Sequence, residues 1–205
     1  MSRHIVAFVA IIVITLLLSS STSHALSLSY WYSDDDTIGH LTKKWIYIDN
    51  WGCGHSPQEA LDFTIIARDQ WRRASIQSHI LDYFSPSIWI YNGSYSALKD
   101  FYPPLEGSAF ETLVFSTADG TYSYNGRTIY NQKILGAILL MPKYPWHYFY
   151  TDNHYRCGYT HELGHAFGWY GHSNTSSDIM HGTLKQAYVL TSRDINHLMQ
   201  IYSYD

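Results

Sequence analysis

The chain has 205 residues, of which 15% are charged and 17% aromatic, and its formal net charge at pH 7 is −4. This length is enough for one domain with a sizeable core. The acidic balance argues against nucleic acid as a partner.

The first 25 residues have the organisation of a secretory signal peptide. A short basic start precedes an apolar run over residues 5–18, and Ser-His-Ala at 23–25 fits the small-x-small cleavage rule. The run is short for a membrane span, which needs about 20 apolar residues, and no later segment is apolar enough. We therefore expect cleavage after Ala25 and a secreted domain of residues 26–205, with an uncleaved N-terminal membrane anchor as the alternative. Without the signal's one arginine the formal charge is 12 − 17 = −5, and we expect a monomer with no stable membrane insertion.

The first elements expected after the signal are a strand and a long helix. Residues 34–36, three aspartates, read as a solvated turn rather than an ion site. Residues 43–50 (KKWIYIDN) alternate and predict a strand. A helix then opens with Ser56 as N-cap, Pro57 in the first position and Glu59 completing a capping box. Its buried stripe is expected to contain Ala60, Leu61, Ile65, Ala67 and Trp71.

Three more strands are expected before the next helix. They are residues 87–94 (SIWIYNGS), 111–117 (ETLVFST) and 133–142 (KILGAILLMP). Asp-Gly and Asn-Gly pairs predict that residues 118–133 form a loop. The region 143–156 is aromatic and irregular, and a helix follows it.

The last expected helix begins after Thr191, which can N-cap it. Its apolar face would contain Ile195, Leu198, Met199 and Tyr202. The order of elements predicts an α+β fold in a single domain. A mixed twisted sheet would carry two long helices, the second ending at a glycine, and a small C-terminal subdomain would contain one helix.

The segment HELGH, His161 to His165, carries the main chemical signal. Residues four apart on a helix share a face, so His161 and His165 can present two imidazoles to one ion. Glu162 lies beside that face and can take a proton from water activated by zinc. The motif alone is weak, because two histidines and a glutamate also occur on ordinary solvated helix faces.

The residues that follow extend the motif. Gly168 stands where the helix has to end, His172 follows it, and Met180 comes eight residues later. HELGHAFGWYGHSNTSSDIMHG resembles the metzincin clan of zinc peptidases, and within it the matrixins, whose pattern is HExxHxxGxxH followed by a Met-turn. The resemblance covers about residues 41–203 and includes the order of elements.

This resemblance implies a metzincin-like domain with one catalytic Zn²⁺. It assigns zinc ligation to His161, His165 and His172, the general base to Glu162, and the Met-turn to Met180. The chain departs from the pattern because Gly171 stands where the third histidine belongs. His172 comes one residue late, and the spacing back from Met180 supports it. His181, Asp178 or a water molecule are the competing third ligands.

The resemblance also implies how a peptide and a second ion would bind. Peptide substrate would add as a strand along Gly136, Ala137, Ile138, Leu139 and Leu140, although these residues can equally be core. His147, Asp152 and His154 are residue types that hold a second structural Zn²⁺ or Ca²⁺ in some matrixins. Their spacing does not reproduce that site, so a second ion is the less favoured alternative.

The two cysteines, Cys53 and Cys157, predict a disulfide, because an exported chain with an even cysteine count favours one. The alternative is a zinc-blocking thiol, since GCGHSP superficially resembles the matrixin cysteine switch. The sequence as a whole predicts a secreted zinc endopeptidase acting on peptide or protein substrates. The alternative from another class is a catalytically inactive, zinc-bearing binding or inhibitory protein.

Overall fold

The computed structural model describes residues 34–82, 86–106, 108–124, 126–145 and 150–203. The predicted signal peptide, residues 1–25, lies outside these ranges. Among the residues described, none of the helices is both long and apolar enough to cross a membrane.

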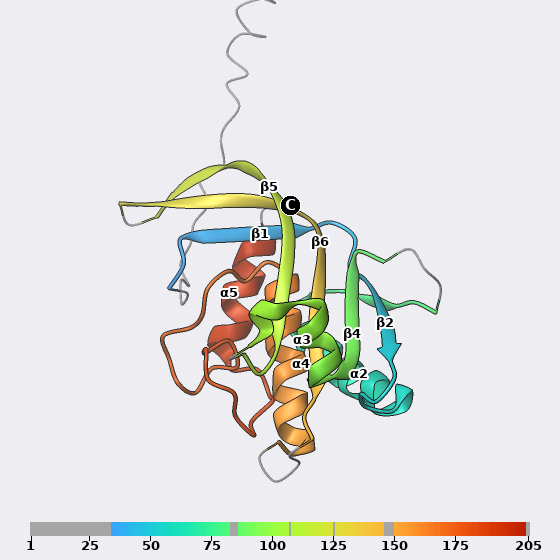
Figure 1. Ribbon diagram of the computed structural model, residues 1–205. Coiled ribbons are helices and arrows are strands. Elements are labelled where there is room, and N and C mark those ends of the chain that lie inside the picture. Colours follow the sequence, from blue (N-terminus) through green and yellow to red (C-terminus); the bar gives the residue numbers. More distant parts are fainter. Residues whose placement is uncertain (1–33, 83–85, 107, 125, 146–149, 204–205) are drawn as a thin grey trace, which may run out of the picture.

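Six strands form one mixed sheet (Figure 1). They are β1 (Thr37–Leu41), β2 (Trp45–Trp51), β3 (His79–Ile80), β4 (Ile88–Ser94), β5 (Glu111–Tyr124) and β6 (Arg127–Lys143). The order is β1-β6-β4-β2-β3 with parallel pairing throughout, and β5 pairs with β6 in the antiparallel sense. Residues 137–140 of β6 pair with both β4 and β5, so β5 forms the edge of the sheet.

The helices lie on both faces of this sheet. Two long helices, α2 (Pro57–Arg72) and α4 (Asp152–Ala166), pack against each other on one face. The short helices α3 (Tyr95–Phe101) and η1 (Pro103–Leu105) lie on the other face, where Leu98, Leu105 and Leu140 form a small cluster. The last helix, α5 (Ser192–Tyr202), lies beside β1. The α+β fold with two long helices is therefore confirmed.

Helix α2 begins as the sequence predicts but buries a different stripe. The Ser56 side chain accepts from the Glu59 amide and Glu59 bonds back, which completes the capping box. The fully buried side chains are Ala60, Phe63, Thr64, Ala67 and Trp71, whereas Leu61 and Ile65 are half-buried. The core face is thus rotated from the predicted one and faces α4, where Phe63 contacts the rings of Tyr155 and Tyr159.

The predicted loop at 118–133 is wrong. These residues form the outer half of a long hairpin made by β5 and β6. The Asn-Gly signal does mark the hairpin turn, where Gly126 has φ +78. The Asp-Gly signal marks a β-bulge instead, because the register shifts between Ala118 and Gly120, where φ is +117.

One core connects the C-terminal region to the rest of the domain. Residues 167–191, which the structure describes throughout, contain neither helix nor strand. Ile179, Met180 and Leu190 from this region nevertheless belong to the same buried cluster as the sheet and α4. This region therefore has a fixed position against α4, where the sequence places the metal ligands.

Candidate metal centre

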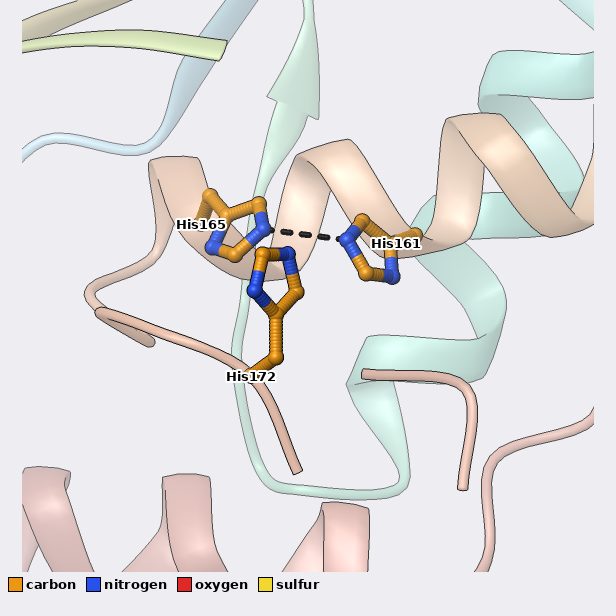
Figure 2. A group of neighbouring side chains, drawn as sticks. All are labelled: His161, His165 and His172. Carbon is orange, nitrogen blue, oxygen red and sulfur yellow. Dashed lines mark hydrogen bonds between the residues drawn. The ribbon is translucent and has the colours of Figure 1, made fainter. Parts of the chain in front are cut away.

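Helix α4 carries the first two candidate ligands and ends where the sequence predicts. Its C-cap is Phe167, and the next residue, Gly168, has φ +114, which only glycine adopts readily. His161 and His165 project from one face of α4 (Figure 2), and their Nε2 atoms are 3.0 Å apart. The helix thus aims both imidazoles at one point.

Main-chain carbonyl groups determine which nitrogen of each ring carries the proton. His161 Nδ1 lies 2.7 Å from the carbonyl oxygen of Ile179, and His165 Nδ1 lies 2.6 Å from that of Trp169. A carbonyl oxygen can only accept, so each Nδ1 is the donor and each Nε2 carries a lone pair in the neutral ring. A carbonyl partner on the far nitrogen is the usual arrangement behind a metal-bound histidine.

Two lone pairs facing each other at 3.0 Å repel unless a cation lies between them. Burial lowers the pKa of both His161 and His165 to about 4, so both rings are neutral at pH 7 and neither Nε2 carries a proton. In a tetrahedral zinc site with Zn–N distances of about 2.0–2.1 Å, ligand nitrogens are about 3.3 Å apart. The donor set therefore fits a zinc ion.

His172 completes the cluster, coming from the loop after α4 (Figure 2). Its ring centroid lies 5.3 Å from that of His161 and 5.2 Å from that of His165. One nitrogen from each of the three rings lies within 4.8 Å of the other two, and within the described ranges this is the only such group of histidine, cysteine or acidic residues. The one-residue lengthening of the loop thus still brings His172 to the site.

The two competing side chains have other partners. Asp178 is fully buried and accepts hydrogen bonds from Arg193, Ser173 and Thr191. His181 Nδ1 accepts from the amide of Thr183. Neither residue joins the three-histidine cluster.

Met180 lies beneath this face of α4. It is fully buried, and a Cβ at Gly164 would approach its Sδ to 2.5 Å. Its amide and that of Ile179 donate to the buried carboxylate of Asp194, at 3.2 and 3.0 Å. Since the Ile179 carbonyl holds His161, Asp194 fixes the turn that orients this ring.

Glu162 is buried next to the histidines, with 6% of its surface exposed. The hydroxyl of Thr112, on β5, donates to Glu162 Oε2 at 2.6 Å. Burial raises the pKa of Glu162, which the neighbouring His165 and the Thr112 hydroxyl partly oppose. A desolvated carboxylate of this kind is suited to accept a proton, because its basicity is increased.

A pocket of about 740 Å³ opens over the three histidines and Glu162. One wall comes from β5 and the residues before it, including Phe110, Thr112 and Val114. Residues 181–184, which follow Met180, also line it. This cleft is large enough for part of a peptide.

The predicted substrate strand is wrong. Residues 136–140 (Gly136, Ala137, Ile138, Leu139, Leu140) lie inside the sheet, and the hydrogen-bonding groups on both sides of residues 137–140 are engaged with β4 and β5. Ala137, Leu139 and Leu140 are fully buried. The edge that borders the pocket is β5, through Glu111, Thr112 and Val114.

The predicted disulfide does not form, and both cysteines are free thiols. Cys53 is exposed in the loop between β2 and α2, whereas Cys157 is buried and lines the pocket. Tyr155 contacts His55 of that loop, with ring centroids 4.2 Å apart. Two steps along a helix rotate the side chain by about 200° about the helix axis, so residues two apart point in nearly opposite directions. Because Tyr155 points toward the loop that contains Cys53, Cys157 points away from it.

The residues considered for a second ion do not form a described cluster. Asp152 and His154 lie in the first turn of α4, and His154 Nδ1 accepts from the amide of Thr151 at 3.1 Å. His147 lies outside the described residues.

Comparisons with known proteins leave the site to be interpreted from its own geometry. No protein-family model matches the chain, and no curated protein matches it. The solved structure of myroilysin is similar over 88% of this chain and 98% of that chain, with 13% sequence identity and a TM-score of 0.40. A likeness at that score establishes neither a common fold nor a common activity.

Proposed function

We propose that the chain is a secreted zinc-dependent endopeptidase with His161, His165 and His172 as metal ligands. The observation that carries the proposal is the facing pair of lone-pair nitrogens of His161 and His165, 3.0 Å apart, with His172 beside them. A cation bound between the two nitrogens relieves that arrangement at neutral pH. The matrixin-like spacing from His172 to Met180 supports the same assignment.

Each residue of the site has a distinct task in peptide hydrolysis. Bound zinc supplies Lewis-acid chemistry, which polarises the scissile carbonyl and lowers the pKa of water. Glu162 accepts the proton of the attacking water and passes it to the leaving amine. Thr112 holds the Glu162 carboxylate at 2.6 Å and keeps it oriented in the cleft.

The substrate would bind as an extended strand beside β5. Within the described strands β5 pairs only with β6, and Glu111, Thr112 and Val114 of β5 line the pocket. Adding a strand there supplies main-chain hydrogen bonds, while the pocket receives alternate side chains. Recognition through the main chain suits peptides and unfolded protein segments.

A second candidate function uses the same ligands without turnover. The short Thr112–Glu162 hydrogen bond also suits a carboxylate that is fixed in place, as in a zinc-bearing binding or inhibitory protein. Cleavage and metal binding separate the two functions.

The direct test is a peptide-library cleavage assay on the mature protein, with and without a zinc chelator. The endopeptidase predicts internal cleavage that the chelator abolishes and added zinc restores. Zinc binding without any cleavage would favour the inactive alternative. Chelator-resistant cleavage would reject the zinc mechanism.

A further inference from the structure

We infer that Asp34 is a positioning residue for the third metal ligand, His172. This inference rests on the proposed zinc site, but it concerns a segment that the sequence interpreted as a solvated turn. Residues 34–41, here called the strap, run along the loop of residues 168–172. The loop is the part of the site that the extra residue lengthens.

Asp34 engages both main-chain groups of His172. Its amide donates to the His172 carbonyl oxygen at 2.8 Å, and its Oδ1 accepts from the His172 amide at 2.5 Å. A hydrogen bond to a carboxylate is stronger than one between neutral groups. Two bonds to one residue also fix its orientation, because they restrain rotation of the main chain on both sides of the Cα.

The strap follows the loop further along its length. Ile38 and Trp169 form an antiparallel β-bridge, and the Gly39 amide donates to the Gly168 carbonyl oxygen at 3.1 Å. The strap itself is anchored to the sheet, because β1 pairs with β6. The loop is therefore attached to the strap at both of its ends, at Gly168–Trp169 and at His172.

Both glycines of the loop fit against the strap. A Cβ at Gly168 would lie 1.9 Å from the Gly39 oxygen, and one at Gly171 would lie 2.2 Å from Asp34 Oδ1. Gly171 also has φ +66, which disfavours any side chain. The contact with the strap therefore requires glycine at the position where the matrixin pattern has histidine.

His172 is held on its other side by the Met-turn segment. The amide of Ser173 donates to the Met180 carbonyl oxygen at 2.8 Å. Carbonyl groups fix the rings of His161 and His165, whereas the hydrogen bonds to Asp34 hold His172 by its main chain. Asp34 thus orders the ligand that lies farthest from the rigid helix.

The test compares Asp34→Ala and Asp34→Asn in the mature chain carrying Glu162→Gln, which prevents self-digestion. Both substitutions remove the charge, but only asparagine keeps an oxygen that accepts from the His172 amide. The zinc dissociation constant is measured by competition with a chromophoric chelator. Amide exchange of residues 168–173 is measured in the metal-free protein.

We expect Asp34→Ala to weaken zinc binding roughly tenfold, the low end for outer partners of metal ligands, and to speed exchange in the loop. Asp34→Asn should stay within a few-fold of the parent. The matched control is Asp36→Ala, which removes a carboxylate from the same strap that pairs with Arg127 instead. It should leave zinc affinity unchanged.

Equal zinc affinity and equal loop exchange in Asp34→Ala and its parent would overturn the role of Asp34. Equal losses in Asp34→Ala and Asp36→Ala would also overturn it, since they would indicate general weakening of the strap. If the parent protein, which carries only Glu162→Gln, binds no zinc, the proposed zinc-dependent function is rejected whatever Asp34 does. In that case, unchanged loop exchange in Asp34→Ala would reject the positioning role as well.

Discussion

The tautomers of His161 and His165 decide what their facing nitrogens can bind. The Ile179 and Trp169 carbonyl oxygens hold the Nδ1 protons, so the two Nε2 atoms are left as acceptors 3.0 Å apart. Glu162 lies next to them, and burial raises the pKa of its carboxyl group while lowering the pKa of both histidines. Neutral ligands and a basic carboxylate are the two states that metal-assisted hydrolysis requires.

Glu162→Gln should keep zinc and lose hydrolysis. Glutamine fills the same space and can still accept from Thr112, but it cannot take a proton from water. We expect turnover to fall on the order of 10²–10⁴-fold, with zinc content unchanged. Peptide cleavage and metal analysis on the same sample check both parts. Near-normal turnover would show that another residue is the base.

His172→Ala should weaken zinc binding strongly, whereas His181→Ala should bind zinc almost normally. His172 belongs to the three-histidine cluster, while His181 accepts from Thr183. Zinc titration of the two variants under identical conditions compares them directly. The reverse order of affinities would assign the third position to His181.

The sequence could predict which histidines form the cluster but not the residues that hold them in place. His161, Glu162 and His165 follow from helical spacing, and His172 follows from counting back from Met180. Thr112 lies 50 residues from Glu162 and Asp34 lies 138 residues from His172. Neither has a local pattern, because their roles come from tertiary contacts alone.

At the scale of single elements, Gly164 shows how closely α4 is packed. A Cβ there would lie 2.5 Å from Met180 Sδ and 2.6 Å from Trp71 Cζ2. Trp71 cannot easily move, because its Nε1 donates to the Thr160 carbonyl oxygen at 2.8 Å. The absence of a side chain at this position lets α4 approach both Trp71 of α2 and Met180.

Gly164→Ala should therefore destabilise the protein, although alanine is the better helix former by about 1 kcal/mol. Overpacking a rigid core costs about 1–3 kcal/mol, so we expect a lower free energy of unfolding and a lower Tm. Gly52→Ala is the control, because a Cβ at Gly52 meets nothing within 4 Å. Chemical denaturation of both variants measures the difference. A Gly164→Ala protein as stable as the parent would contradict the close packing.

The sequence predicted most elements but misplaced the edge of the sheet. Residues 133–142 and 111–117 both read as strands, and period-two alternation cannot say which of two strands lies outside. Their order is set by tertiary pairing with β4, whose partners in β6 lie 49 residues further along the chain, since Ile88 pairs with Ala137 (137 − 88 = 49). The strand at the edge of the sheet is therefore β5, whereas the sequence predicted that substrate binds along β6. The strand β1 was missed because its five residues follow a polar, acidic segment.

For the whole molecule, buried histidines connect stability to pH. Burial lowers the pKa of His55, His161 and His165 from 6.5 to about 4. Between these values the unfolded chain binds protons that the folded chain does not, so each histidine destabilises the metal-free protein as pH falls. A proton bound only by the unfolded chain lowers the free energy of unfolding by on the order of 1 kcal/mol per pH unit. The raised pKa values of Glu162 and Asp194 act in the opposite direction.

His55→Phe isolates one of these contributions. His55 is buried and packs edge-on against the rings of Phe63 and Tyr155, and it does not belong to the three-histidine cluster. In metal-free protein, the stability of the variant should fall less steeply than that of the parent as pH drops from about 6.5 to about 4. Urea denaturation at several pH values measures both slopes. Parallel slopes would show that His55 titrates normally in the folded state.

The central claim is that His161, His165 and His172 together hold one zinc ion. Elemental analysis of the purified mature protein, after dialysis against metal-free buffer, tests it most directly. The account predicts one zinc per chain. A protein that folds and contains no zinc, and takes none up when zinc is supplied, would contradict it.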